Sequence, residues 1–271
     1  MTETPQALLG IVAAAGTADV DLALSALALA AIARPNLKLD PYRSHLAELA
    51  DQAPRRLRGT GDDARALAEA ATATLRDTYG YDGDRTTYDD RRNADLAYVI
   101  DRRRGLPVAL GILYIHAVRA MGASAHGINF PGHFLVGIGT PRGSVMIDPF
   151  NGGRMLDGDE LESMLPPNTP LAQEHLAALS DRGTLIRLQN NILSRSRAAG
   201  DWVRAALTLE SLTRMAPGTA QFHYELGDAY VRIERPNAAR VALQKALAAE
   251  PSAPWAQQAQ ALLSATLRSL N

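Results

Sequence analysis

The stretch from residue 129 to residue 153 constrains the fold more than any other part of this chain, because it has the pattern of a β-hairpin. Residues 133–139 and 144–150 alternate between apolar and small or polar side chains, which is typical of half-buried strands. The four residues between them place proline second and glycine fourth, as a type I turn prefers. The sequence therefore predicts that Gly139 pairs with Ser144.

This register brings two chemically active residues to one face of the hairpin. Counting outward from the predicted pair places Leu135 opposite Asp148, and His133 points to the same side as Leu135. His133 and Asp148 would then be diagonal neighbours within hydrogen-bonding reach. A histidine oriented by an aspartate supplies two members of a nucleophilic triad. We therefore treat His133 and Asp148 as a candidate catalytic dyad.

The third member of such a triad cannot be a thiol, because the 271 residues include no cysteine. The same fact excludes disulfides, thiolate metal sites and thiol nucleophiles. Ser144 carries a hydroxyl in the same hairpin, but its position at the tip is expected to keep it far from His133.

The overall charge and hydropathy limit the classes of partner. The net charge of −1 gives no bulk attraction to nucleic acid or to an anionic membrane, so neither is expected as a partner. The first residues lack the basic start of a signal peptide, and no apolar stretch is long enough to span a bilayer. We therefore expect a cytoplasmic protein, and no motif calls for a cofactor.

Residues 1–92 are expected to form a helical lobe, since three segments in it combine apolar periodicity with helix start signals. The expected helices span residues 17–34, 41–49 and 62–75. Thr17 or Asp19 would cap the first of them.

The segment 79–93 is rich in turn formers and acids and is expected to be a loop. Its acidic cluster has the composition of a calcium loop but lacks the spacing and the final glutamate of an EF-hand, so metal binding is not expected. The cluster consists of Asp82, Asp84, Asp89 and Asp90. Asn93 is expected to cap a helix over 94–102. The run Arg102–Arg104 is interpreted as a solvated face, with anion binding as the alternative.

The pattern at 107–121 predicts a helix that is apolar around nearly its whole circumference and therefore buried on most sides. His116 and Arg119 are its only strongly polar members, and His116 is expected to be a hydrogen-bonded core histidine. A short strand over 125–130 precedes the hairpin. Residues 93–165 would thus form an α+β core, with a buried helix on a small antiparallel sheet.

Residues 171–271 follow a proline-rich break and contain an internal repeat. Pro217 and Pro251 lie 34 residues apart, and this offset aligns apolar positions of two copies. A period of 34 residues is typical of tetratricopeptide repeats. The second copy resembles that family at Leu226, Gly227, Tyr230, Ala239, Leu243, Ala246 and Pro251. The first copy departs from it at Leu193 and Ser196, and a helix over 254–270 would cap the stack.

A further set of motifs lies in the middle of the chain. It consists of the segments 79–83, 103–110, 129–136 and 148–150, together with Tyr88, Asn93, Tyr114, Gly122, Gly152, Gly153 and Leu156. In these motifs the chain resembles the SirB1-like branch of the transglutaminase-like superfamily, which is often found with C-terminal tetratricopeptide repeats. The resemblance covers roughly residues 17–270.

The resemblance implies a papain-like core, in which a cysteine at the N-terminus of a buried helix faces a histidine and an aspartate on adjacent antiparallel strands. In this chain the histidine is His133 and the aspartate is Asp148. The cysteine would fall at Val108 or Ala109, and neither side chain can act as a nucleophile. The resemblance thus implies a fold more firmly than a reaction.

The first functional hypothesis is a core without catalysis that binds a protein or peptide partner, with the repeat helices as a second interaction surface. The histidine and aspartate would then only tie two strands together. The pocket of this core would be lined by Asn129, Phe150, Val108 and Ala109.

The alternative is a hydrolase or an acyl- or amide-processing enzyme without a protein nucleophile. His133, oriented by Asp148, would act as general base, and the free N–H groups at the start of the buried helix would hold a developing anion. A third hypothesis makes His133, Asp148 and either His116 or His126 the ligands of a zinc-type metal, although no short-range ligand motif supports it.

Overall fold

The computed structural model describes residues 4–58 and 61–270, and these residues divide into two compact units. One unit comprises residues 15–188, and the other combines the residues up to Ala14 with those from Gln189 onward. No helix in the described ranges is long and apolar enough to cross a membrane. The division into three segments, with boundaries near residues 92 and 165, is finer and stays a prediction.

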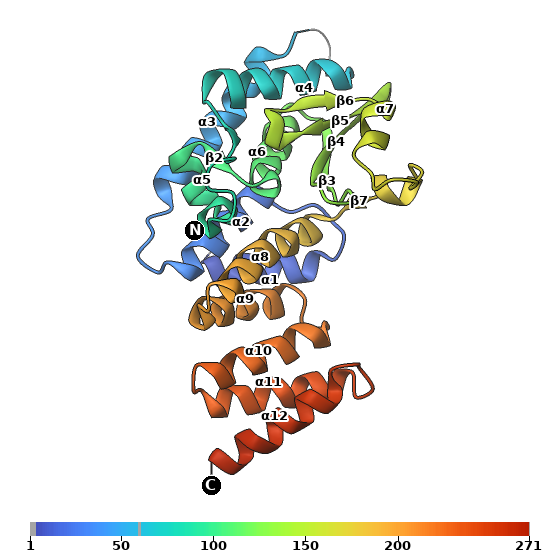
Figure 1. Cartoon of the computed structure of the whole chain (residues 1–271). Helices are drawn as coiled ribbons and strands as arrows, with labels where there is room; N and C mark the ends of the chain where they lie inside the picture. Colours follow the sequence, from blue (N-terminus) through green and yellow to red (C-terminus); the bar gives the residue numbers. More distant parts are fainter. Residues whose placement is uncertain (1–3, 59–60, 271) are drawn as a thin grey trace. The chain divides into compact units, whose positions relative to one another are not determined.

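The unit of residues 15–188 combines helices with a small antiparallel sheet (Figure 1). Its helices are α2 (Leu22–Ala33), α3 (Asp40–Arg56), α4 (Ala64–Thr72), α5 (Leu96–Arg102), α6 (Pro107–Ala120) and α7 (Gly158–Ser163). The strands of the sheet, in spatial order, are β6 (Arg154–Leu156), β5 (Gly143–Asp148), β4 (Leu135–Thr140), β3 (Ser124–Ile128) and β7 (Ala178–Leu179). A parallel pair joins β1 (Asp82–Gly83) to β2 (Arg104–Gly105). This mixed architecture confirms the α+β class.

Helix α6 is the buried helix of this unit, as predicted. Pro107 opens it, and its side chains from Val108 to Ile115 are all buried. The helix packs against β3 and β4, and Figure 1 shows it beside the sheet. Gly111 allows the closest approach, since a Cβ at this position would lie 2.5 Å from the Phe134 ring.

The register of the hairpin is confirmed, because β4 and β5 pair Gly139 with Ser144. The predicted start of the first strand at residue 133 is wrong. Gly132 adopts φ +75° and the N–H of His133 donates to the Phe130 carbonyl at 2.9 Å, so His133 belongs to a turn before β4.

Two predicted helix starts are wrong for the same reason, namely that the expected cap is used elsewhere. Helix α2 is capped by Asp21, because Asp19 faces Arg119 at 3.2 Å. Helix α5 is capped by Asp95, because Asn93 serves the loop before it. Helix-start patterns could not distinguish these neighbouring caps, since Asp19 faces an arginine 100 residues away and Asn93 contacts Thr87 and Arg102 on either side of it.

Helix α3 continues to Arg56, beyond its predicted end at residue 49. Leu46, Leu49 and Ala53 are buried and lie at helical spacing, so the apolar stripe carries on past that point. After α4 the chain continues as a π-helical turn (Ala73–Thr78).

A buried ion pair joins distant segments of this unit. Arg119, in the last turn of α6, donates from both Nη atoms to the carboxylate of Asp181 at 2.7 and 2.9 Å. The side chain of Asp181 is 2% exposed and also accepts the N–H of Val20 at 2.9 Å. Arg119 further donates to the carbonyl of Ala125 in β3 at 2.9 and 3.1 Å. The pair therefore connects α6 and β3 to the segment before α2 and to the start of α8 (Asp181–Ala198).

The other unit is helical in its described part. It contains α9 (Trp202–Met215), α10 (Ala220–Arg232), α11 (Pro236–Ala249) and α12 (Ala256–Ser269). Consecutive helices of this group pack against each other. Gly227 brings α10 close to α11, since a Cβ there would lie 2.6 Å from the side chain of Leu243. Tyr224 stacks on Trp255 with a centroid distance of 4.9 Å.

We expect Asp181→Asn to lower the free energy of unfolding by about 3 kcal/mol, because it leaves the largely buried Arg119 guanidinium beside a neutral group. Asp19→Asn is the matched control, since it removes a carboxylate that also faces Arg119 but is 78% exposed. We expect that control to cost less than about 1 kcal/mol. Urea denaturation followed by circular dichroism measures both, and equal losses would contradict the role given to Asp181.

Candidate functional site

Asp148 lies at the end of β5 and is 6% exposed. It accepts hydrogen bonds from the backbone N–H groups of Phe150 at 2.9 Å and Asn151 at 3.2 Å. It also accepts one from Nδ2 of Asn151 at 2.6 Å. The carboxylate therefore caps the short 3-10 turn that follows it (Pro149–Asn151), and β5 ends at residue 148 and not at residue 150 as predicted.

His133 is exposed in the turn before β4, and its ring lies 6.4 Å from the ring of Phe130. In the part of the chain that the structure describes, no hydrogen bond or ion pair joins His133 to Asp148. Their role as a catalytic dyad stays a prediction.

The remaining predicted site residues have different surroundings. Val108 and Ala109 lie in the first turn of α6 and are 2% and 0% exposed. Asn129 is exposed directly after β3. Phe150 is half-buried and packs on the loop before α5, where Tyr88 meets its ring edge-on at 5.8 Å.

The histidines considered as metal ligands have other environments. Nε2 of His116 lies 2.9 Å from the carbonyl of Leu46, as expected for a hydrogen-bonded core histidine. Burial and the nearby Arg119 charge lower the pKa of His126. Among the described residues, no group of three or more histidine, aspartate and glutamate side chains is arranged to hold a metal ion.

The acidic loop before α5 is held by an internal network. Asp84 is 5% exposed and accepts Oγ1 of Thr87 at 2.6 Å and Nη2 of Arg102 at 2.7 Å. Burial raises the pKa of Asp84, but the hydrogen bonds from Thr87 and Arg102 outweigh it and lower that pKa to about 2. Arg102 also donates to Oδ1 of Asn93 at 3.0 Å. The interpretation of Arg102 as part of a solvated face is therefore wrong.

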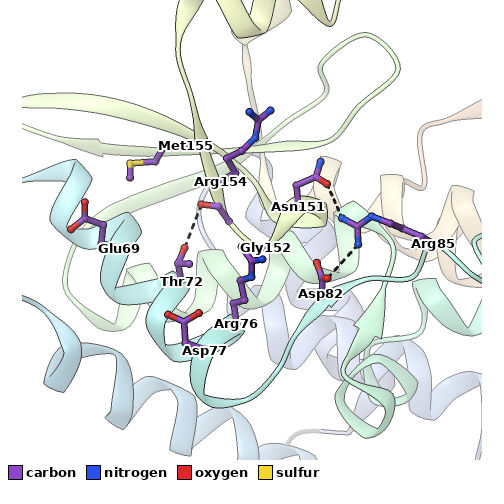
Figure 2. Close-up of a pocket in the computed structure, with 11 residues that line it drawn as sticks. Glu69, Thr72, Arg76, Asp77, Asp82, Arg85, Asn151, Gly152, Arg154 and Met155 are labelled. Atoms are coloured by element: carbon purple, nitrogen blue, oxygen red, sulfur yellow. Dashed lines mark hydrogen bonds and ion pairs between the residues drawn. The ribbon is translucent and has the colours of Figure 1, made fainter.

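A cleft of about 660 Å³ opens beside the turn that Asp148 caps (Figure 2). This volume lies in the range of small-molecule and peptide side-chain sites. The cleft is lined by Glu69, Thr72, Arg76, Asp77, Asp82, Arg85, Asn151, Gly152, Gly153, Arg154 and Met155. The sequence did not predict it, because its walls come from two distant parts of the chain, residues 69–85 and residues 151–155.

The two glycines at the base of the cleft are required by geometry. Gly152 and Gly153 adopt φ +65° and +76°, which favour glycine. A Cβ on Gly152 would lie 2.6 Å from the side chain of Arg76, and one on Gly153 would lie 2.4 Å from Oγ1 of Thr72. The dipeptide is thus the sequence signal that could have located the cleft.

The charged groups of the cleft differ in how far they are already paired. Arg85 donates to Oδ1 of Asn151 at 2.7 Å and to the carbonyl of Phe150 at 3.1 Å, and Arg154 pairs with Glu160. The described residues provide no hydrogen bond or ion pair to the side chain of Arg76. The same holds, within the described ranges, for the carboxylates of Glu69 and Asp77. The cleft therefore offers one open guanidinium and two open carboxylates to a ligand.

Comparison with known proteins adds a family and several relatives. A family model described as Transglutaminase-like superfamily matches residues 40–190. A UPF0162 protein of Xylella fastidiosa (strain 9a5c) is 34% identical over 181 residues, which are 64% of this chain and 64% of that protein. A UPF0162 protein of Pseudomonas aeruginosa is 28% identical over 209 residues, which are 75% of this chain and 77% of that protein.

A more distant relative is the F-box only protein 21 of Homo sapiens, which is 26% identical over 142 residues. That match covers 49% of this chain and 22% of that protein. The chain thus spans 64% of the length of the Xylella relative. No solved structure matches this chain.

We expect Gly153→Ala to lower the free energy of unfolding by about 1–3 kcal/mol, because the new methyl group meets Thr72 and the residue must keep a left-handed conformation. Gly158→Ala is the matched control, since no atom lies within 4 Å of the added Cβ and its φ is not positive. Thermal and urea unfolding measure the difference. A loss for the control as large as that for Gly153→Ala would contradict the account of the turn.

Proposed function

We propose that this chain, which belongs to the transglutaminase-like superfamily, is a module without catalysis that binds a protein or peptide partner. The observation that carries the proposal is the set of hydrogen bonds that the Asp148 carboxylate accepts. Its carboxylate is engaged by three hydrogen bonds from its own turn, at 2.9, 3.2 and 2.6 Å. Among the described residues it makes no hydrogen bond to His133, whereas a triad aspartate must orient a histidine.

The first turn of α6 supports the same conclusion. Thiol acyl transfer needs a thiolate, and the sequence contains no cysteine. Val108 and Ala109, where the resemblance places the nucleophile, are an alkyl side chain and a methyl group at 2% and 0% exposure. The position is therefore filled by packed apolar atoms.

We infer that the cleft beside Gly152 and Gly153 is the binding site of the core. An extended peptide presents both acidic and basic side chains at regular intervals, and the cleft offers partners for both. Arg76 would bind a carboxylate, while Glu69 and Asp77 would bind a lysine or arginine of the partner.

Our proposal also includes the finer family assignment. The motifs that resemble the SirB1-like branch and the 34-residue period support placing the chain in that branch with C-terminal tetratricopeptide repeats. The consecutive packing of α9 to α12 is compatible with such repeats and supports a second surface for a protein partner.

Fluorescence anisotropy with a library of labelled peptides tests the binding site. We expect peptides with both acidic and basic side chains to bind. Arg76→Ala should lower their affinity about tenfold, equivalent to about 1.4 kcal/mol. Arg65→Ala is the matched control, since Arg65 is an exposed arginine of α4 outside the cleft. Peptides that bind Arg76→Ala as tightly as the unchanged protein would contradict this assignment.

A second experiment tests the absence of catalysis. We expect Ala109→Cys to react with a thiol reagent only on unfolding and to show no acyl-enzyme burst with a thioester, because the position is buried and Asp148 is engaged. Circular dichroism checks that the variant folds. Rapid thiol reaction with a burst, or turnover by the unchanged protein that His133→Ala abolishes, would show that the histidine still takes part in chemistry.

A further inference from the structure

A second cleft, of about 520 Å³, opens between α3 and the C-terminal end of α5 in the same unit. The proposed function does not use it. Its lining includes Lys38, Tyr42, His45, Asp101 and Arg103. Its volume suits a small molecule.

Three polar groups converge at the wall of this cleft. Nε2 of His45 lies 2.8 Å from the hydroxyl of Tyr81 and 2.8 Å from Nη1 of Arg103. The same Nη1 also donates to the Tyr81 hydroxyl. The guanidinium carbon of Arg103 lies 4.7 Å from the centre of the Tyr81 ring. The arginine is therefore held in place with its charge beside the cleft.

These three groups contain more donors than acceptors. Burial, and then the charge of Arg103, lower the pKa of His45, so its ring is neutral near pH 7. Nδ1 lies 3.5 Å from the carboxylate of Glu48, which assigns the ring proton to that nitrogen. Nε2 then accepts the hydroxyl of Tyr81, and the oxygen of that hydroxyl accepts Nη1 of Arg103. Among the described residues, Nε and Nη2 of Arg103 are without an acceptor.

The rim of the cleft adds a second cation. Lys38 is exposed, and the residues described by the structure form no hydrogen bond or ion pair with its ammonium group. The acid of the lining, Asp101, accepts the hydroxyl of Tyr42 at 2.9 Å. Lys38 and Arg103 are therefore the charged donors that remain for a ligand.

We propose that this cleft binds a small molecule through an oxyanion, either a carboxylate or a phosphate, that accepts hydrogen bonds from Arg103 and Lys38. An oxyanion provides the acceptor that the histidine–tyrosine–arginine cluster lacks, and charge-assisted bonds to guanidinium and ammonium groups are strong. The inference is independent of the peptide site, which uses other residues.

The lysine content of the chain permits a direct test. The chain has two lysines, Lys38 and Lys245, so reductive methylation with ¹³C gives two side-chain signals, and Lys245→Arg assigns them. We titrate the full chain with inorganic phosphate, with succinate and with sodium chloride at equal ionic strength. The Lys38 signal should shift saturably with phosphate or succinate, while the Lys245 signal should not.

The two anions distinguish the chemistry, since saturation by only one of them identifies a phosphate or a carboxylate ligand. Arg103→Gly should lower the affinity for the saturating anion at least tenfold, because glycine can keep the backbone φ of +56° while the guanidinium is removed. Lys38→Gln, followed by equilibrium dialysis, gives the same test if Arg103→Gly does not fold. The proposal is overturned if both lysine signals drift together with salt, if neither anion saturates, or if the variants bind as tightly as the unchanged chain.

Discussion

The ion pair between Arg119 and Asp181 is the interaction on which the unit of residues 15–188 depends. It places a guanidinium at the end of the most buried helix and a carboxylate at 2% exposure at the start of α8. Because the same two side chains bind the N–H of Val20 and the carbonyl of Ala125, they fix four segments at one point. Replacing either charge alone would leave the other desolvated, so the arrangement holds as a unit.

Features of the fold that depend on local patterns could be predicted from the sequence, and features that depend on distant contacts such as those of Arg119 could not. The buried helix and the pairing of Gly139 with Ser144 depend on local patterns, namely all-round apolarity and alternation about a turn, and both are confirmed. The start of α2 depends on Asp19, which faces an arginine 100 residues away in the chain. No local pattern encodes that choice, and the cap therefore fell to Asp21.

The candidate site also has features that the sequence predicted and features that it could not predict. The sequence predicted Asp148 in the second strand of the hairpin, before the glycine pair, and the structure places it there as the last residue of β5. The sequence could not foresee the walls of the cleft, because Arg76 and Arg154 come from elements that meet only after folding. Nor could alternation alone show that Gly132 turns the chain at φ +75° and removes His133 from the strand.

The run Arg102–Arg104 shows how position in the fold decides the role of identical side chains. Arg102 is part of the network of Asp84, and Arg104 donates to the carbonyl of Gly80 at 2.7 Å. Arg103, between them, has φ +56° and ends α5, so its side chain is directed to the His45 cluster. Three consecutive arginines thus have three different sets of partners, namely the Asp84 network, the His45 cluster and the Gly80 carbonyl.

Asp148 is likewise held by its surroundings, through contacts that reach the lining of the cleft. Its carboxylate accepts Nδ2 of Asn151 at 2.6 Å, and Oδ1 of the same amide accepts Arg85 at 2.7 Å. Its carbonyl accepts the N–H of Gly153 at 2.9 Å, which closes the turn. The residue that the family resemblance associates with orienting a histidine therefore holds the turn that borders the cleft. Among the described residues no hydrogen bond joins this carboxylate to His133, and its three hydrogen bonds all lie within the turn that borders the cleft.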